Sequence, residues 1–472
     1  MVKVLWVINK YIVFDDYENN YLIFLETLQE NLLKYEIELH YIFFNKKLFK
    51  KIDKPNNHYF NTSNFQNLSD IEVEKIGLEI EKKYKFTFKQ SSFADIIQNV
   101  NSHKNQRNIH IPFKYFNNFK QEIENFQNIE TIILEKHIDV IFSDVSPESE
   151  MEFGRIIGNY YNKIVIKDYE GAFLGRSVFL KSKSFGLDEV INCDLNNELT
   201  YNESQNFIND YIKNKKLPYS YPSKTTDKKQ FNIFNLLTNK LFNKNILKDV
   251  YRIFMNFYYF CETNFFKKLS YDSFDKDLNY FFFGLHLNQE STMVLRSQPF
   301  TNQIVLLEML SRVLPINHYI YVREHPHWKS TFPLTYLIKV KKLNNIKLIS
   351  PDISIHEILS NSKGVITYNS TTGIESLFYE KPVLSFASNI YYKNDTSVFF
   401  CNNLYLLGEN LINLLITKVD KDETIKYLQK MHKCSYNFWL GSYFFITIED
   451  AINKADLFSI YLSKAIKTCK ND

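Results

Sequence analysis

Residues 364–386 read GVITYNSTTGIESLFYEKPVLSF, and this stretch decides the fold class. A β-branched run ends at Tyr368, a turn of small polar residues follows, and an amphipathic segment leads to a second apolar run at Pro382–Phe386. Strand, turn, helix and strand in this order are typical of a parallel α/β unit. Hydroxyl groups and free N–H groups meet at the positive end of the predicted helix, which predicts a phosphate-binding site.

The residues of this turn are the first candidate ligands of the site. Ser370, Thr371, Thr372 and Gly373 form the turn, and Glu375 lies in the first turns of the helix. Ser370 or Thr371 also suits a helix N-cap, and capping is compatible with phosphate binding. Glu375 either accepts hydrogen bonds from ribose hydroxyls or complements the helix dipole, and the sequence leaves both open.

Short apolar runs and longer amphipathic stretches alternate along the rest of the chain, which indicates parallel sheets. The runs fall into two sets separated by residues 200–275, which carry no comparable strand pattern. We therefore expect two α/β domains, at 1–200 and 276–440, a helical middle segment at 201–275, and C-terminal helices at 441–472. The predicted strands are 2–9, 37–45, 139–144, 163–168 and 189–193 in the first domain, and 280–286, 318–324, 346–350, 364–368 and 382–386 in the second.

Ligands bind at the carboxyl ends of parallel strands, so the residues after each strand are the candidates for chemistry. The run YIYVREHPH at 319–327 brings Arg323 and His325 to a strand end, where Pro326 stops the ladder. Imidazole at this position suits a donor to a phosphate or to a leaving group near neutral pH.

Two further segments follow predicted strands. In the second domain, a polar run after residue 286 contains Glu290, and Gln298 lies shortly beyond it, ahead of a predicted helix at Gln303–Leu314. In the first domain, a strand is expected to end in a turn at Asp168-Tyr-Glu-Gly171. Asp168 or Glu170 would then face the cleft between the two predicted domains, where a carboxylate could act as a general base.

Composition excludes several classes of function. Lys and Arg total 57 against 53 Asp and Glu, a net charge of +4, which gives no case for nucleic acid as the main partner. The five cysteines form no CxxC pair and no metal-ligand cluster is apparent, so we expect neither a metal nor a cofactor. The sequence contains no run of about 18 apolar residues, the length that a membrane-spanning helix needs. A cytoplasmic location fits best.

The middle segment 224–268 mixes basic and aromatic residues in a helical pattern. Two interpretations remain open: a helical pair packed between two domains, or a surface in peripheral contact with an anionic membrane, on the cytoplasmic face of the inner membrane.

These motifs together carry a family resemblance. The turn Asp168–Gly171, the pair His325-Pro326 and the turn Ser370–Thr372 resemble three motifs of bacterial GT-B sialyltransferases, which are similar in turn to capsule polysaccharide Kdo transferases. The stretch from His286 to Phe386, including Gln298-Pro299, resembles the capsular polysaccharide biosynthesis family especially. The resemblance is weak in the first domain.

The resemblance implies a GT-B fold, in which two Rossmann-like domains face a central cleft. It implies a metal-independent glycosyltransferase that transfers Kdo, sialic acid or a relative such as pseudaminic acid from a CMP-activated donor to a bacterial surface glycan, as in capsule, lipooligosaccharide or glycoprotein. Residues 1–200 would serve the acceptor and residues 276–440 the nucleotide sugar.

Residue roles follow from the same resemblance. His325 would contact the CMP phosphate, Ser370 and Thr371 the phosphate or the sugar carboxylate, and Glu170 would be the catalytic carboxylate. Tyr169 departs from the sialyltransferase motif, which has an acid there, so retention through a carboxylate nucleophile such as Glu290 stays open beside inversion with Glu170 as base. Other functions compatible with the sequence are transfer from a UDP-sugar or CDP-glycerol, and a non-catalytic scaffold for capsule assembly.

Overall fold

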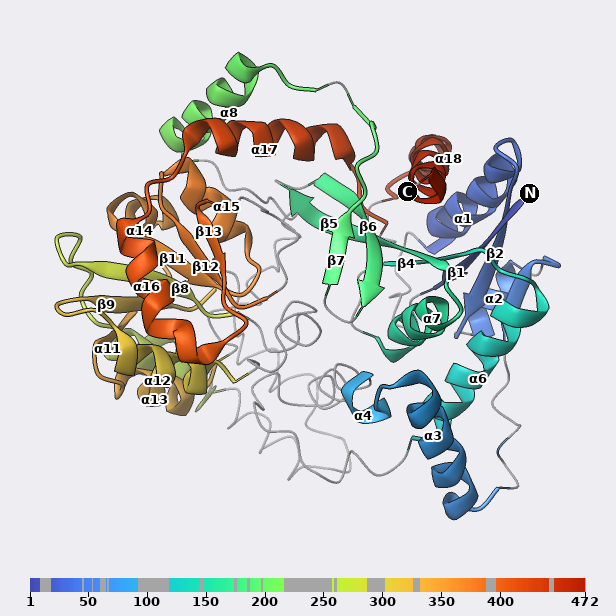
Figure 1. Ribbon diagram of the computed structural model, residues 1–472, viewed down its shortest axis with the longest axis horizontal. Helices are drawn as coiled ribbons and strands as arrows, with labels where there is room; N and C mark the ends of the chain where they lie inside the picture. The colour runs from blue at the N-terminus through green and yellow to red at the C-terminus, as the bar shows by residue number, and fades with distance from the viewer. Residues whose placement is uncertain are drawn as a thin grey trace, which may run out of the picture.

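Two α/β halves, each built around its own sheet, make up the chain (Figure 1). The computed structural model describes residues 1–8, 18–44, 46–52, 54–59, 65, 68–91, 119–144, 148–173, 176–184, 187–196, 198–215, 257–258, 261–286, 302–325, 332–387, 396–440 and 445–471. The described ranges confirm two Rossmann-like domains, the arrangement expected of a GT-B fold.

The first sheet has the strand order β14-β6-β5-β4-β1-β2-β3, with β7 paired to β6. The five strands from β5 to β3 are parallel, whereas β6, β7 and β14 are antiparallel to their neighbours. The strands are β1 (Val2–Val7), β2 (Ile37–Phe43), β3 (Asn57–Tyr59), β4 (Val140–Asp144), β5 (Ile164–Phe173), β6 (Arg176–Ser184), β7 (Leu187–Val190) and β14 (Ser435–Tyr436).

Helices cover both faces of this sheet because its strands carry apolar side chains alternately up and down. Leu5 and Val7 of β1 pack with α3, α6 and α7 on one face, and Val4 and Trp6 pack with α1 and α18 on the other. The helices of this half are α1 (Glu18–Leu33), α2 (Lys46–Lys51), α3 (Asp70–Tyr84), α4 (Phe88–Ser91), α6 (Lys120–Glu135), α7 (Ser149–Tyr160) and α18 (Ile448–Asn471).

The predicted turn at Asp168–Gly171 is wrong, because β5 continues through it to Phe173. Antiparallel pairing with β6 satisfies the backbone of this segment: Asp168 lies opposite Phe179 and Phe173 opposite Arg176. The register shifts between Tyr169 and Phe173, so the segment with Gly171 forms an irregularity within a strand instead of a turn after one.

The second sheet is parallel throughout its six strands, in the order β10-β9-β8-β11-β12-β13. Numbered from β8, this is the order 3-2-1-4-5-6 of the dinucleotide-binding Rossmann fold. The strands are β8 (Tyr280–Gly284), β9 (Tyr319–Arg323), β10 (Ile346–Ile349), β11 (Gly364–Thr367), β12 (Val383–Ser385) and β13 (Val398–Phe400).

The helices of the second half include one turn of π-helix, η2, that runs directly into α11. They are η2 (Glu262–Phe266), α11 (Lys267–Ser270), α12 (Gln303–Val313), α13 (Leu334–Lys341), α14 (Ile355–Asn361), α15 (Thr371–Phe378), the short 3-10 helix η5 (Leu404–Leu406) and α16 (Leu407–Ile416). Asn302 caps α12, because its side chain accepts from the N–H groups of Ile304 and Val305.

Two long helices, α8 (Tyr201–Lys213) and α17 (Lys421–Cys434), run side by side where the chain crosses between the halves (Figure 1). After α17 the chain returns to the first sheet as β14, which pairs with β6, and α18 packs against α1. The return therefore begins at Ser435, earlier than the expected boundary at residue 440. The predicted C-terminal helices are one helix, α18.

Each of the ten predicted strands overlaps an observed strand, whereas β3, β6, β13 and β14 have no counterpart in the sequence analysis. The overlooked strands lie at the edges of the two sheets or beside the crossing, where pairing with a distant strand outweighs the local pattern.

Two stacked histidines join β2 to the edge strand β3. Nδ1 of His40 lies 3.2 Å from Nε2 of His58, and the two rings are nearly parallel. Burial lowers the pKa of His58 from 6.5 to about 4, and the neighbouring His40 acts in the same direction. Burial also lowers the pKa of His40, although the adjacent carboxylate of Glu38 opposes this shift. Both rings are therefore neutral in the folded protein at neutral pH.

We expect the free energy of unfolding to decrease as the pH is lowered from 6.5 to about 4. Across this range His58 is protonated in the unfolded state but stays neutral in the folded state, because its pKa is lower there. Urea denaturation across this range measures the slope. The variant His58→Asn should flatten it, whereas His137→Asn, at an exposed histidine with a positive φ of 54°, should leave it unchanged. Equal slopes in all three proteins would contradict this assignment.

Candidate functional site

The strand order of the second sheet reverses between β8 and β11. These neighbouring strands connect onward in opposite directions, β8 through α12 to β9 and β11 through α15 to β12, so the segments after them diverge and leave a crevice at their carboxyl ends. The crevice of such a sheet is where nucleotides bind. The residues after β8 and β11 thus form the candidate site.

Helix α15 points its N-terminus at this crevice. Ser370 is the N-cap: its Oγ accepts from the N–H of Thr372 at 3.2 Å and donates to Thr372 Oγ1 at the same distance, and its carbonyl accepts from the N–H of Gly373 at 3.0 Å. The capping role predicted for Ser370 is confirmed. Thr371 and Thr372 are half-buried at the first two helical positions, beside the positive end of the helix dipole.

A buried polar layer lies beneath this turn. Nε2 of His286, after β8, is 3.3 Å from the Oγ1 of Thr367, the last residue of β11. The side chain of Gln303, the first residue of α12, accepts from the N–H of His286 at 2.9 Å and donates to its carbonyl at 2.7 Å. These bonds fix the chain after β8 in position and join it to both β11 and α12.

Asn369, between β11 and the cap residue, is the unexplained member of the site. Its side chain is 2% exposed, and within the part of the chain that the structure describes neither its Oδ1 nor its Nδ2 has a hydrogen-bond partner. Leaving a buried amide unpaired costs about 1–3 kcal/mol for each unsatisfied group. Such a residue at a strand end that faces a crevice points to a ligand or an ordered water that supplies the missing partners.

The end of β9 carries three charged or titratable side chains with different surroundings. Arg323 is buried, donates to the carbonyl of Ile353 at 2.8 Å and lies over the ring of Phe282. Burial lowers the pKa of Arg323 to about 10, and the carboxylate of Glu375 opposes that shift. His325 is exposed at the strand end, which suits contact with a ligand.

Glu324, between them, has a structural role. Its Oε1 accepts from Lys267 Nζ at 2.8 Å and its Oε2 from the hydroxyl of Tyr271 at 2.7 Å, and the carboxylate is fully buried. This pair holds α11 against the end of β9.

Glu375 is buried at the junction of the two halves. Its carboxylate accepts from the hydroxyl of Tyr211 on α8 at 2.5 Å and from the side chain of Thr371. Burial raises the pKa of Glu375, while these two hydrogen bonds and the charge of Arg323 act to lower it. The carboxylate therefore links the phosphate turn, the end of β9 and the crossing helix.

One hydrophobic cluster extends across both halves at this point. It joins Tyr169 of β5 and Val178 of β6 to Tyr211 of α8 and Ile374 of α15, together with Met431 of α17. The end of β5 is thereby attached to the helix that carries the candidate phosphate turn.

The two first-domain acids differ in their positions. Asp168 is fully buried on the face of the sheet covered by α1 and α18, where its Oδ1 accepts from the hydroxyl of Tyr436. The structure does not bring Asp168 to the crevice. The backbone of Glu170 follows Tyr169 in β5, within the irregularity of register, and its side chain lies outside what the structure describes.

The remaining predicted residues, Glu290 and Gln298, lie outside the described residues, so the structure brings together only the part of the predicted site formed by β9, β11 and α15. Tyr211 belongs to the site, and the sequence does not indicate it. A tyrosine in an amphipathic helix far from the site carries no signal of its own, because only the packing of α8 on α15 brings it to Glu375.

A buried ion cluster joins α7 to β5 in the first half. Glu152 of α7 accepts from Arg155 at 2.6 Å and from Lys167 of β5 at 3.0 Å. Burial alone would raise the pKa of Glu152, but the two cations prevail and lower it to about 2. The helix lies close to the sheet because Gly158 has no Cβ, which would come within 2.6 Å of Ile141.

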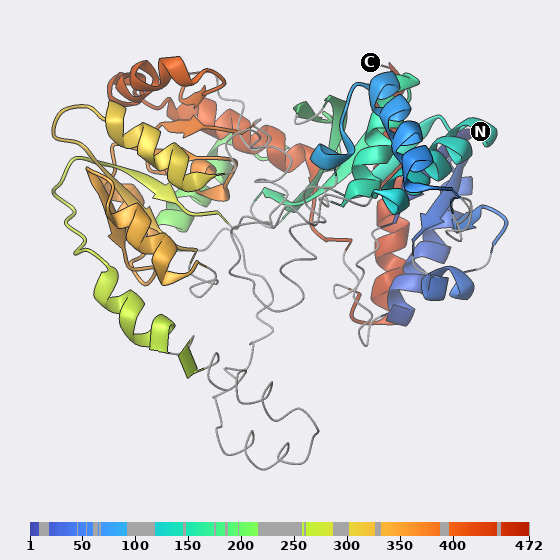
Figure 2. The same ribbon diagram turned by 90° about the horizontal axis from the view of Figure 1, so that it is seen from below.

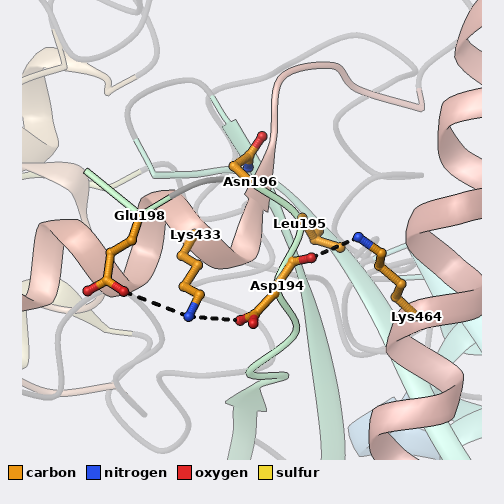
Figure 3. Close-up of a pocket in the computed structure, with 6 residues that line it drawn as sticks. All are labelled: Asp194, Leu195, Asn196, Glu198, Lys433 and Lys464. Carbon is orange, nitrogen blue, oxygen red and sulfur yellow. Dashed lines mark hydrogen bonds and ion pairs between the residues drawn. The ribbon is translucent and has the colours of Figure 1, made fainter. Parts of the chain in front are cut away.

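A pocket of about 630 Å³ lies at the crossing instead of at the strand ends (Figure 3). Its lysines are already engaged: Lys433 pairs with Asp194 at 3.1 Å and Glu198 at 3.7 Å, and Lys464 donates to the carbonyl of Asp194 at 2.9 Å. Figure 3 shows these side chains turned toward one another. We interpret it as an ion-paired junction between α17, α18 and the segment after β7.

Within the described ranges, no cluster of three or more His, Cys, Asp or Glu side chains is arranged to hold a metal ion.

Replacing Tyr211 with Phe should lower the free energy of unfolding by about 1.5–3 kcal/mol, because it removes a buried hydrogen bond to a carboxylate and leaves Glu375 short of a donor. Tyr201→Phe is the matched control on the same helix: Tyr201 donates to Asp422 at 2.7 Å at the surface, and its loss should cost less than about 0.5 kcal/mol. Urea unfolding of both variants measures the difference, and equal costs would refute the assigned role.

Comparisons with known proteins agree with this picture only in part. No curated protein matches the chain. Among solved structures, the Kdo transferase KpsC of Thermosulfurimonas dismutans is 14% identical over 64% of this chain and 88% of its own, with a TM-score of 0.31. A glycosyltransferase of Rickettsia africae is 12% identical over 100% and 99% of the two chains, with a TM-score of 0.27. At these TM-scores neither likeness bears on function.

The match to a family model is more informative, because it covers the candidate site. Residues 206–394 match the model of the capsule polysaccharide biosynthesis protein family. This range contains the C-terminal part of α8 with Tyr211, the end of β9 with His325, and the Ser370 turn of α15. Over this part of the chain, the resemblance to capsule polysaccharide biosynthesis proteins that the motifs predict is confirmed.

Proposed function

We propose that this protein is a glycosyltransferase of capsule or related surface-glycan synthesis, and that its donor is a CMP-activated keto sugar such as Kdo or a nonulosonic acid. The observation that carries the proposal is the turn Asn369–Thr372 at the reversal point of a 3-2-1-4-5-6 sheet, within the range that matches the family model. The proposed acceptor is a glycan destined for the cell surface.

The second half of the chain, which we propose binds the nucleotide sugar, presents neutral and dipolar groups to a single phosphate. The N-terminus of α15, the hydroxyl groups of Thr371 and Thr372, and the exposed imidazole of His325 suit the phosphate of CMP, and the unpaired amide of Asn369 suits the nucleotide or the sugar. Glu375 is engaged by Tyr211 and Thr371, so we assign it to positioning the turn, and not to holding ribose.

In the proposed reaction, an acceptor hydroxyl attacks the anomeric carbon of the keto sugar and the bond to the CMP oxygen breaks. The proton of the hydroxyl passes to Glu170, and the charge that develops on the CMP phosphate is stabilised by the helix end and by His325. A retaining enzyme would instead use Glu290 as a nucleophile, and the anomeric configuration of the product, read by NMR, separates the two. We propose that neither route needs a metal.

A peripheral location on the cytoplasmic face of the inner membrane belongs to this proposal. It is supported by the basic and aromatic composition of residues 224–268. Among the helices that the structure describes, none has the length and apolar character needed to cross a bilayer.

Ligand binding tests the donor. We expect CMP to raise the melting temperature of the full chain by more than UDP does at equal concentration, because only a ligand of the folded state adds to its stability. The rise should be lost in Thr371→Val/Thr372→Val, which removes two hydroxyl groups while keeping side-chain shape. Thr396→Val, which removes an exposed hydroxyl bound to Glu423, is the control. A response to UDP or CDP-glycerol and none to CMP would assign a different donor, and a response to no nucleotide would exclude the transferase function.

Catalysis tests the carboxylate. Glu170→Gln should lower kcat for CMP release in the presence of acceptor by about 10²–10⁴-fold, since the general base is lost, while binding of CMP stays intact. His325→Ala should weaken donor binding and kcat together. Glu189→Gln, at an exposed acid of β7, should leave both unchanged. Full activity of Glu170→Gln would remove Glu170 from the mechanism.

A further inference from the structure

Large apolar side chains are exposed on the helical segment that ends in α11. Phe265 is 57% exposed, Phe266 50% and Leu269 81%, and Phe257 and Tyr258, just before them, are exposed as well. Three such side chains within five residues are unusual on a water-facing helix, because each keeps its apolar area in contact with solvent.

Helix α13 lies beside this segment and extends its surface. Lys341 of α13 donates to the carbonyl of Ser270 at 2.8 Å and pairs with Asp272 at 3.1 Å, and Glu262 of η2 accepts from the N–H of Leu334. The side chains of α13 that face solvent include Ile338, Lys339 and, just past its end, Lys342. In Figure 1 the labels of α11 and α13 stand at the same edge of the second half, and Figure 2 shows the helix of residues 262–270 at the side away from the first sheet.

We define the α11–α13 face by its exposed apolar residues and its exposed lysines. These are Phe257, Tyr258, Phe265, Phe266, Leu269 and Ile338, with Lys268, Lys339 and Lys342.

Lysines outnumber acids close to this face. Residues 325–351 contain five lysines and neither Asp nor Glu. Of the acids near the face that the structure describes, Glu262 is buried, Asp272 is paired with Lys341, and Asp352 is exposed close to Tyr271. The three exposed lysines of the face outnumber the one exposed acid among these, so the face carries a net positive charge that favours an anionic counterpart.

We propose that the α11–α13 face docks on an anionic lipid bilayer, with Phe265, Phe266 and Leu269 inserted at the level of the headgroups and the lysines in contact with lipid phosphates. Aromatic and leucine side chains framed by lysines are the composition of helices that lie in the membrane interface. The long lysine stems also let the ammonium groups reach the phosphates while the apolar side chains enter the bilayer.

A second copy of the chain fits this face less well. A twofold interface would place the same patch against itself and bring Lys268, Lys339 and Lys342 of one copy close to those of the other. Like charges at close range oppose that contact, whereas phosphatidylglycerol headgroups neutralise them.

Co-sedimentation of the full chain with vesicles tests the proposal and requires neither donor nor acceptor, so its outcome is independent of the proposed transferase activity. We expect binding to vesicles of phosphatidylglycerol and phosphatidylcholine at least about tenfold tighter than to phosphatidylcholine alone, weakened by high salt. The apolar variant Phe265→Ser/Phe266→Ser/Leu269→Ser and the charge variant Lys268→Glu/Lys339→Glu/Lys342→Glu should each lose at least about tenfold in affinity.

Matched controls lie on other exposed elements. Tyr405→Ser/Ile412→Ser/Ile416→Ser on η5 and α16, and Lys418→Glu/Lys426→Glu/Lys430→Glu on and before α17, should bind like the unchanged protein. Because all of these side chains are exposed, the melting temperature of each variant should equal that of the unchanged protein. If one of the two test variants fails to fold, the other still tests the proposal by itself. The proposal is overturned if the protein binds both kinds of vesicle equally, or if test and control variants lose the same affinity for vesicles. It is also overturned if the protein sediments as a dimer that only the test variants abolish.

Discussion

The candidate site depends on one buried contact, in which the hydroxyl of Tyr211 on α8 donates to the carboxylate of Glu375 on α15. A carboxylate cannot stay buried without partners, so its donors must be held in place by the fold. Around this bond a shared hydrophobic cluster joins β5 and β6 of the first sheet to α15 and α17 of the second half. The candidate phosphate turn is thus attached to the helix through which the chain leaves the first sheet.

The crossing has a second support at its other end. There, Asp194 and Glu198 pair with Lys433, and the carbonyl of Lys433 accepts from the N–H groups of Leu195 and Asn196. Exposed ion pairs contribute little to stability, whereas the apolar cluster contributes most of it. The two ends therefore differ: the apolar cluster beside α15 contributes most to holding the halves together, and the other end is joined by ion pairs and backbone hydrogen bonds.

Much of the architecture follows from the sequence, because buried parallel strands are continuous apolar runs and their βαβ connections leave a clear period. All ten predicted strands are present, and Ser370 caps α15 and Asn302 caps α12, as their side chains suggest. The turn at Asp168–Gly171 failed as a prediction because its acids and glycine are compatible with a turn, while the antiparallel partner β6 makes it a strand. Asp168 is accordingly buried against Tyr436, a residue far along the chain.

The sequence by itself determined the two sheets, the position of the Ser370 turn before α15 and the family resemblance of residues 206–394, because these depend on local periodicity and on residue types close together in the chain. Only the tertiary structure decided which side chains meet. Tyr211 reaches Glu375, Lys267 neutralises Glu324, and α13 lies beside α11 to form a basic apolar face, all through contacts between residues far apart in sequence. Such contacts depend on packing in three dimensions, which local patterns do not record.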